Sequence, residues 1–318
     1  MTERMRDTYD VAVVGGGAAG LSGALMLARA RRSVVVVDAG APRNAPAAAV
    51  HGLLGRDGMP PSELLERGRA EVRSYGGHVV TGEVGSVTRA DDGFAVALAD
   101  GRRTLVRRLL VATGLVDELP DIPGLQDRWG RDVVHCPYCH GWEVRDRAIG
   151  VLATGPRSLH QALLFRQWSD DVTYFTHTMA QPTDEELERL AARGIDVVEG
   201  EVGSLEIVDD RLVGVRLRDD MLVDREVLAV AARMVPRAGF LSELGLRPEE
   251  HPGGFDEHLR ADAMGRTDVP GVWVAGNVTD LAAQVGAAAA AGAMAAAQIN
   301  ADLVEEDTER AVAARPAA

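Results

Sequence analysis

The sequence predicts an α/β protein built on two strand–helix–strand units. The first unit joins apolar strands at residues 9–14 and 33–37 through a glycine-rich turn and a helix. The second joins strands at 148–152 and 172–175 through another helix. Strands that alternate with helices in this way are typical of parallel sheets that are covered by helices.

Composition favours a soluble enzyme. The 318 residues are enough for about two domains of roughly 100–200 residues each. No stretch reaches the roughly 20 uninterrupted apolar residues of a membrane-spanning helix. The charged segment Met1–Asp10 lacks the layout of a signal peptide, so we expect a cytoplasmic protein. The net charge of −14 disfavours a nucleic-acid partner and is compatible with a small or neutral substrate.

A glycine fingerprint lies between the first two strands. Residues 15–20 read Gly-Gly-Gly-Ala-Ala-Gly, which matches G-x-G-x-x-G in a strand–turn–helix setting. Gly15 makes the tight turn, Gly17 lets a pyrophosphate approach the backbone, and Gly20 lets helix and strand pack closely. Asp38 ends the second strand, where it can accept hydrogen bonds from ribose hydroxyls. The motif predicts a Rossmann-like dinucleotide site; the alternative is a glycine-rich turn that binds nothing.

Further elements follow from periodicity and turn signals. We expect additional strands at residues 83–88, 93–98, 103–105, 108–112, 195–198, 211–217, 226–231 and 271–275. We expect helices at 21–30, 158–168, 183–193 and 281–303. The charged segment from residue 302 to residue 318 is expected to be frayed or disordered.

The only two cysteines form the C-x-x-C sequence Cys136-Pro-Tyr-Cys139. Structural disulfides are uncommon in the cytosol, so the pair is either a redox couple or half of a metal site. A zinc site needs four ligands, and the flanking His135 and His140 adjoin the cysteines too closely to converge easily on one metal. We therefore favour the redox couple and expect no metal. His140 can exchange a proton near neutral pH or stabilise a thiolate, unless it is simply a core histidine.

The order of these motifs resembles low-molecular-weight thioredoxin reductase over nearly the whole chain. The matching motifs are Gly15–Gly20, Ala112-Thr113-Gly114, Cys136–Cys139, and Ala275-Gly276-Asn277 followed by Gln284. The resemblance implies two Rossmann-like dinucleotide-binding domains. A discontinuous FAD domain would comprise residues 1–116 and 241–318, and an inserted NAD(P)H-like domain, 117–240, would carry the redox cysteines. The family commonly forms two-fold dimers, so we expect a homodimer.

The resemblance also implies contacts with FAD, position by position. It places the pyrophosphate on Gly15, Gly17, Ala18, Ala19 and Gly20, the ribose on Asp38, and the adenine beside Val84. It places Asn277 at the ribityl chain, where the family usually has Asp, and Gln284 and Val285 at the flavin pyrimidine. Arg43, Asn44 and His51 would border the flavin. The remaining implied contacts are Ala39, Ala112, Thr113, Gly114 and Gly276.

The inserted domain departs from the family where a nicotinamide should bind. The loop Ala153–Ser158 has Ala in place of the first glycine, and Pro156 removes a backbone N–H that could hold a phosphate. The family's NADPH users cluster Arg after the next strand, whereas this chain has Thr176-His177-Thr178. We therefore expect that NADPH is not used. The alternative is that NADPH binds through Arg157 or Arg166.

The redox motif departs as well, because His140 follows the second cysteine where thioredoxin reductases have an acid. Cys-Pro-Tyr-Cys-His-Gly, an aromatic residue and Glu together resemble the dithiol oxidases of the gliotoxin, holomycin and romidepsin pathways, which keep FAD and do without a nicotinamide. This implies an FAD-dependent oxidase that closes a disulfide in a small-molecule dithiol through Cys136 and Cys139, with O2 as acceptor and H2O2 as product. Cys136 would be the exchange sulfur. The alternatives are an NADPH-dependent thioredoxin reductase-like enzyme and a non-enzymatic FAD-bound redox sensor.

Overall fold

A computed structural model describes residues 5–315, which form two compact units. Unit 1 comprises residues 1–45, 61–116 and 234–318, and unit 2 comprises residues 46–60 and 117–233. Loop 46–60 is thus grouped with unit 2 and residues 234–240 with unit 1, whereas the resemblance implies domain limits at residues 116 and 240. The loop makes contacts inside unit 2, where His51 Nε2 lies 3.4 Å from Glu143 Oε1.

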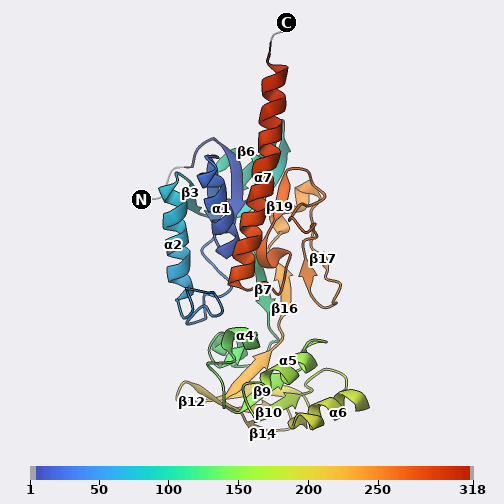
Figure 1. The fold of residues 1–318 in the computed structure, drawn as a ribbon. Helices are drawn as coiled ribbons and strands as arrows, with labels where there is room; N and C mark the ends of the chain where they lie inside the picture. Colours follow the sequence, from blue (N-terminus) through green and yellow to red (C-terminus); the bar gives the residue numbers. More distant parts are fainter. Residues whose placement is uncertain (1–4, 316–318) are drawn as a thin grey trace. The chain divides into compact units, whose positions relative to one another are not determined.

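Unit 1 is built on a seven-stranded sheet in which β6 pairs with β1, β5 and β19. The strands, in sheet order, are β3 (His78–Thr81), β2 (Val34–Asp38), β1 (Thr8–Val14), β6 (Arg103–Val111), β5 (Gly93–Leu98) and β4 (Val84–Ala90), with β19 (Val272–Val274) beside β6. All pairs are parallel except β4–β5 and β5–β6. The helices of this unit are α1 (Ala18–Arg29), α2 (Pro61–Ser74) and α7 (Val285–Ala313) (Figure 1).

The central strands are buried on both faces, as near-continuous Val runs predict for a parallel sheet. Residues 11–13 of β1 and 34–37 of β2 are at most 2% exposed. The two strands predicted at 103–105 and 108–112 are in fact one strand, β6. The prediction divided them because Arg107 and Arg108 interrupt the apolar pattern.

Helices α1 and α7 approach one another at backbone distance. A Cβ on Gly292 would lie 1.9 Å from the carbonyl oxygen of Ala19, and a Cβ on Gly23 would lie 3.0 Å from that of Gly292. Both helices follow strands of the same parallel set, β1 and β19, which pair with β6. Because the carboxyl ends of parallel strands share one edge, both helices begin there.

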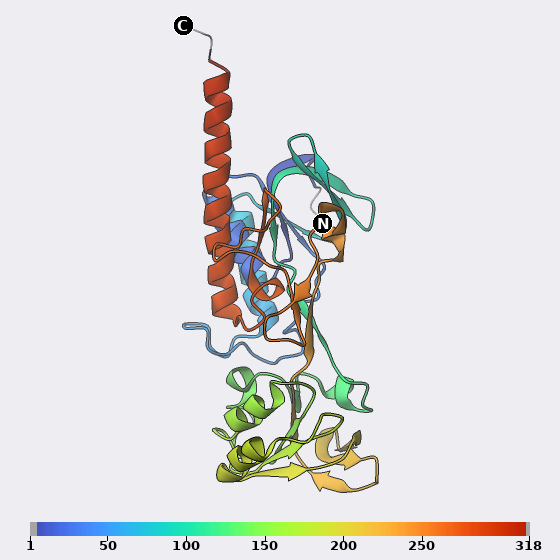
Figure 2. The ribbon, with the colours of Figure 1, turned by 90° about the vertical axis from the view of Figure 1, so that its right-hand side faces the viewer.

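Helix α7 is longer than predicted and continues beyond the end of the sheet (Figure 1 and Figure 2). The expectation of a frayed segment from residue 302 is wrong as far as Ala313, where the helix ends. Residues 316–318 of that segment lie outside the described chain. Ion pairs to two arginines of β6 explain the added helical length.

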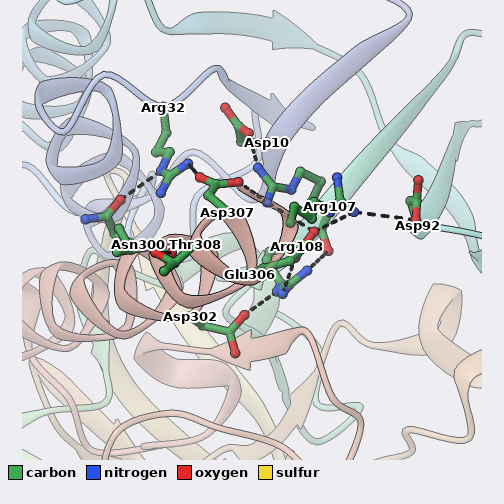
Figure 3. Close-up of polar contacts among 12 residues, drawn as sticks. Asp10, Arg32, Asp92, Arg107, Arg108, Asn300, Asp302, Glu306, Asp307 and Thr308 are labelled. Atoms are coloured by element: carbon green, nitrogen blue, oxygen red, sulfur yellow. Dashed lines mark hydrogen bonds and ion pairs between the residues drawn. The ribbon is translucent and has the colours of Figure 1, made fainter. Parts of the chain in front are cut away.

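Arg107 and Arg108 of β6 bind the acidic face of α7 (Figure 3). Arg107 donates to Asp307 at 2.5 Å and to Glu306 at 3.1 Å, and Arg108 contacts Glu306 at 2.6 Å and Asp302 at 2.5 Å. Burial alone would raise the pKa of Glu306, but the charges of Arg108 and Arg107 and their hydrogen bonds lower it overall. The carboxylates are therefore held in the ionised form that the pairs require.

Unit 2 contains a five-stranded parallel sheet and a three-stranded antiparallel sheet. The parallel strands, in sheet order, are β11 (Ile195–Val198), β10 (Val172–Phe175), β9 (Ile149–Leu152), β15 (Val227–Val230) and β8 (Val133–Val134). The antiparallel strands are β12 (Val202–Val208), β13 (Arg211–Leu217) and β14 (Leu222–Asp224), and the helices are α3 (Leu125–Arg128), α4 (Pro137–His140), α5 (Ser158–Phe165) and α6 (Asp184–Ala192). Thr183 begins α6 with a capping box to Glu186.

The remaining strands form two small ribbons. Strands β7 (Leu115–Glu118) and β16 (Arg233–Pro236) pair where the chain passes between the units, and β17 (Glu249–Glu250) pairs with β18 (Glu257–His258) in unit 1. The 3-10 helices η1 (Gly239–Leu244) and η2 (Gly276–Val278) complete unit 1. Among residues 5–315, no helix combines the length and apolarity needed to cross a membrane.

We predict that Gly292→Ala lowers the free energy of unfolding by about 1–3 kcal/mol, because the new methyl group overlaps the Ala19 carbonyl. Gly239→Ala is the matched control, since its Cβ would enter open space. Urea denaturation followed by circular dichroism measures both. Equal stability of the two variants would mean that the close helix contact is absent.

We predict that Glu306→Gln destabilises the protein more at pH 7 than at pH 3. A carboxylate whose pKa is lowered by folding stabilises the fold above its unfolded pKa of about 4.3, and this contribution disappears as the pH falls through the folded pKa. Urea midpoints at the two pH values should show this difference. Glu305→Gln, at an exposed position of the same helix, should show none.

Candidate active site

The glycine turn between β1 and α1 has the geometry that the fingerprint requires. Gly15 has φ +106°, and a Cβ there would lie 2.3 Å from the carbonyl oxygen of Ala112. A Cβ on Gly20 would lie 1.9 Å from the carbonyl oxygen of Gly15. The first and last glycines are thus needed by the turn and by its packing against the end of β6.

The middle of the turn is open to a ligand. A Cβ on Gly17 would meet nothing within 4 Å, and Gly17 begins α1 without any side-chain cap. The first-turn N–H groups of a helix have no intrahelical acceptors, so those of Ala18, Ala19 and Gly20 are suited to an anion. The open cradle fits the pyrophosphate of a dinucleotide such as FAD.

Asp38 lies beside this turn and is held by a residue that the sequence patterns did not identify. Arg69 of α2 donates to the Asp38 carboxylate at 3.0 Å. A Cβ on Gly16 would lie 2.6 Å from that carboxylate, so a larger residue there would displace the Asp38 side chain. The only sequence signal for Gly16 was its place in an uninterrupted Gly-Gly-Gly. Nothing local in the sequence pointed to Arg69.

Other predicted cofactor residues lie at the same edge of the sheet. The Thr113 hydroxyl is buried and has no hydrogen-bond partner among the described residues. Gly114 and Gly276 have positive φ angles of 67° and 78°, and Ala112, directly after β6, is 7% exposed. An orphaned hydroxyl beside the open turn is consistent with a site for a polar ligand.

Asn277 closes the turn that leads into α7. Its amide nitrogen donates to the carbonyl oxygens of Asp280 at 3.0 Å, Leu281 at 3.3 Å and Ala283 at 2.9 Å. A carboxylate cannot donate these bonds, which gives a physical reason for Asn at a position where the resemblance implies Asp. The adjacent Gln284 is exposed and begins α7 without a side-chain cap, so this second helix N-terminus is also suited to a ligand.

The remaining predicted FAD contacts are distributed over both units. Val84 is buried in the core of unit 1, Ala39 is exposed, and Asn44 is half-buried. Arg43 donates to the sulfur of Met234 at 3.5 Å. His51, in contrast, belongs to unit 2. Their contacts with FAD, like those of Val285 at the start of α7, stay predictions.

The cysteine pair lies in unit 2 at the end of strand β8. Cys136 precedes α4, and its carbonyl oxygen accepts the N–H groups of Cys139 and His140, both at 3.1 Å. Both cysteines are half-buried. Gln161 of α5 donates to the His135 carbonyl at 2.6 Å, which fixes the segment immediately before the pair.

His140 is a half-buried base beside this pair. Neither of its ring nitrogens has a hydrogen-bond partner among residues 5–315. Burial lowers the pKa of His140; the nearby backbone of Cys136 and the negative charge of Glu143 oppose this shift, and the charge of His51 adds to it. His51 Nε2 lies 3.4 Å from the Glu143 carboxylate. A neutral imidazole is therefore available near pH 7, and a nearby carboxylate can stabilise its protonated form.

Glu143 and Gly141 are site residues that were not predicted. A Cβ on Gly141 would lie 2.4 Å from the Pro137 carbonyl oxygen and 2.7 Å from the Trp168 ring. Only glycine lets the turn after α4 pack this closely. Glu143 was visible in the motif, but its pairing with His51 depends on a loop that is remote in sequence.

The loop after β9, residues 153–158, satisfies its own N–H groups by internal hydrogen bonds. The N–H groups of Thr154 and Gly155 both donate to the Ser158 hydroxyl, at 3.0 and 3.3 Å. Ser158 is fully buried, and the Thr154 hydroxyl donates to the carbonyl of Ala231 at 2.8 Å. Two donors at the position of a phosphate loop are thus satisfied within the protein.

The polar residues near this loop are engaged as well. Arg157 donates to the Ala232 carbonyl at 3.1 Å, and Arg166 donates to the Arg193 carbonyl at 2.7 Å. His177 Nδ1 accepts the Val202 N–H at 3.0 Å, and burial lowers the His177 pKa. Within residues 5–315, no group of three or more His, Cys, Asp or Glu residues could hold a metal ion.

Comparisons with known proteins agree with this architecture. Residues 9–297 match the family described as pyridine nucleotide-disulphide oxidoreductase. Thioredoxin reductase tcpT of Claviceps purpurea (strain 20.1) is 32% identical over 316 residues, which cover 92% of this chain and 95% of the relative. Thioredoxin reductase aclD of Aspergillus oryzae (strain ATCC 42149 / RIB 40) is 30% identical, with 85% and 88% covered.

Among solved structures, HlmI is 50% identical with a TM-score of 0.91, and the match covers 99% of this chain and 98% of HlmI. An oxidoreductase from Agrobacterium tumefaciens is 35% identical with a TM-score of 0.87, and the match covers 93% and 99% of the two chains. The chain therefore belongs to the pyridine nucleotide-disulphide oxidoreductase family, as a flavin-dependent disulfide oxidoreductase of the thioredoxin reductase type.

Proposed function

We propose that this protein is an FAD-dependent dithiol oxidase that closes a disulfide in a small-molecule dithiol and transfers the electrons to O2. The observation that carries the proposal is the closed loop after β9. Its Thr154 and Gly155 N–H groups bind the Ser158 hydroxyl and are not free for a nicotinamide phosphate. An enzyme that cannot take hydride from NADPH must be reduced by its thiol substrate.

The overall reaction is balanced as dithiol plus O2 giving cyclic disulfide plus H2O2. A substrate thiolate attacks the Cys136–Cys139 disulfide, and the second substrate thiol then resolves the mixed disulfide, leaving the enzyme as a dithiol. Two electrons and two protons leave the substrate. Bound FAD supplies the two-electron acceptor between the enzyme dithiol and O2.

His140 is the base that this exchange requires. Its lowered pKa keeps the ring neutral near pH 7, so that it can accept the proton of an incoming thiol. The charge of Glu143 then stabilises the imidazolium. The resemblance of Cys136–Glu143 to the motif of dithiol oxidases supports the same assignment.

A second candidate function is an NADPH-dependent disulfide reductase. The relatives that carry the name thioredoxin reductase favour it. It would require the loop 153–158 to open and release the Ser158 hydroxyl. The two functions differ in which reductant delivers electrons to the enzyme.

We predict that anaerobic dithiothreitol bleaches the flavin absorbance near 450 nm whereas stoichiometric NADPH leaves it unchanged. In air, dithiol oxidation should yield one H2O2 per disulfide, as measured with a peroxidase-coupled assay. Cys139→Ser should abolish turnover. Rapid bleaching by NADPH would establish the reductase and eliminate the oxidase.

We predict that His140→Asn lowers kcat/KM for dithiols by about 10²-fold, which is typical of removing a general base. Because folding lowers the pKa of His140, the acid limb of the wild-type kcat/KM profile should lie below about pH 6.5, the ordinary value for histidine. The limb should vanish in the variant. His160→Asn, at an exposed histidine of α5, should leave both rate and profile unchanged.

We predict that Gly17→Val yields a folded protein that purifies with little FAD, because the side chain fills the open cradle above α1. The ratio of absorbance at 450 nm to that at 280 nm measures occupancy without any assay of activity. Gly239→Ala should retain full occupancy. A Gly17→Val protein with normal FAD content would place the pyrophosphate elsewhere.

A further inference from the structure

The two most exposed Phe, Trp or Tyr side chains in the described part of the chain lie within and just after the redox motif. Tyr138 lies between Cys136 and Cys139 and is 63% exposed, and Trp142 is 66% exposed. Among residues 5–315, no other Phe, Trp or Tyr side chain exceeds the 49% of Tyr75. Only 4% of the residues are aromatic. The presence of two exposed aromatic rings within five residues therefore indicates a functional role.

Both rings are held in place although they face solvent. Tyr138 packs edge-on against Trp168, with ring centroids 5.9 Å apart. The Arg145 guanidinium stacks over the Trp142 ring at 4.2 Å and donates to the Trp142 carbonyl at 2.5 Å. Rings that are fixed in this way lose little conformational entropy when a ligand covers them.

The helical backbone brings the two rings to the same side. The N–H of Gly141 donates to the Pro137 carbonyl at 2.7 Å, and that of Val144 donates to the His140 carbonyl at 3.2 Å. These bonds continue the turn of α4 through residue 144. Tyr138 lies in α4 and Trp142 in the turn that follows it. Because Gly141 keeps helical φ and ψ angles, we infer that the two side chains, four residues apart, project from the same side.

We propose that Tyr138 and Trp142 form a binding platform for the ring system of the substrate, which is an uncharged, flat, conjugated or aromatic small molecule that carries the dithiol. This inference rests on the proposed function and names its substrate class. Stacking on the platform holds the molecule by its ring while its two thiols reach the cysteines. The aromatic rings thereby determine which dithiols are preferred.

The size of the platform favours a small molecule over a protein partner. An aromatic side chain buries about 150–250 Å² at most, whereas a stable protein interface covers about 800 Å² on each partner. The apolar surface is bounded at once by the exposed charged residues Glu143, Arg145 and Asp146. Two rings with a charged border match the size of a bicyclic ligand.

A pair of probes separates ring recognition from the redox chemistry. Dithiothreitol and 1,2-benzenedimethanethiol both close a six-membered cyclic disulfide, with O2 reduced to H2O2, but only the second carries a fused benzene ring. We expect the wild type to favour the ring-bearing dithiol in kcat/KM. Trp142→Ala and Tyr138→Ala should each reduce this preference by about 3- to 10-fold, mainly through KM, and the double variant should reduce it further.

Two variants serve as matched controls. Trp142→Phe should keep most of the preference, because the ring is retained. Tyr75→Ala removes another exposed aromatic residue that also stacks with an arginine, Arg29, but lies in unit 1; it should leave both rates unchanged. Calorimetry with the cyclic product 1,4-dihydro-2,3-benzodithiin measures binding without turnover, and Trp142→Ala should weaken it by a similar factor.

The inference is overturned if the alanine variants lower the rates of both dithiols equally, or if they leave product binding unchanged. It is also overturned if they impair reduction of a thioredoxin but not oxidation of the ring-bearing dithiol, because the rings would then serve a protein. If the wild type oxidises dithiothreitol but does not prefer 1,2-benzenedimethanethiol, the platform is ruled out and the proposed function stands. If the wild type oxidises neither dithiol, both the proposed function and the platform are ruled out.

Discussion

The close backbone contact between α1 and α7 is the constraint on which the cofactor half of the molecule depends. Gly292 lets the two helices approach until a methyl group would overlap the Ala19 carbonyl. Helices at this distance, following parallel strands on either side of β6, begin at one edge of the sheet. Two uncapped helix N-termini, at Gly17 and Gln284, are thereby brought to the same edge. A long anionic cofactor with two distinct ends can bind across such an arrangement.

The ionic network of α7 extends this arrangement toward the C-terminus. Glu306 and Asp307 bind two arginines that interrupt the apolar residues of β6. The arginines are tolerated in β6 because acidic groups of the helix neutralise them, and the helix persists because the arginines bind its final turns. Each element supplies the partner that the other requires, although about 200 residues separate them in the chain.

The redox half of the molecule combines a half-buried base with exposed rings. Burial keeps His140 neutral, and Glu143 is close enough to stabilise its charged form. Tyr138 and Trp142 remain in solvent, where large apolar side chains are unfavourable unless a ligand covers them. Nearby, the Ser158 hydroxyl replaces a phosphate as the acceptor of two loop N–H groups. These three features support our proposal that the unit exchanges thiols with a small molecule and does not bind a nicotinamide.

The local patterns of the sequence determined a large part of this protein. The glycine fingerprint and its flanking Val strands predicted β1, α1 and β2 because turn geometry and apolar runs depend on neighbouring residues. The C-x-x-C spacing and the motif order likewise indicated a flavin disulfide oxidoreductase.

Only the tertiary structure determined which residues far apart in the sequence form ion pairs and packing contacts. The pairing of Arg69 with Asp38, the grouping of His51 with Glu143, and the closure of α7 onto β6 each join residues that are far apart in sequence. Such contacts leave no periodic signal, since the Coulomb and packing energies that select them arise only once the chain has folded. For the same reason the expectation of a frayed segment from residue 302 was wrong. The sequence alone indicated that its acidic side chains are solvated, whereas in the fold they bind the arginines of β6.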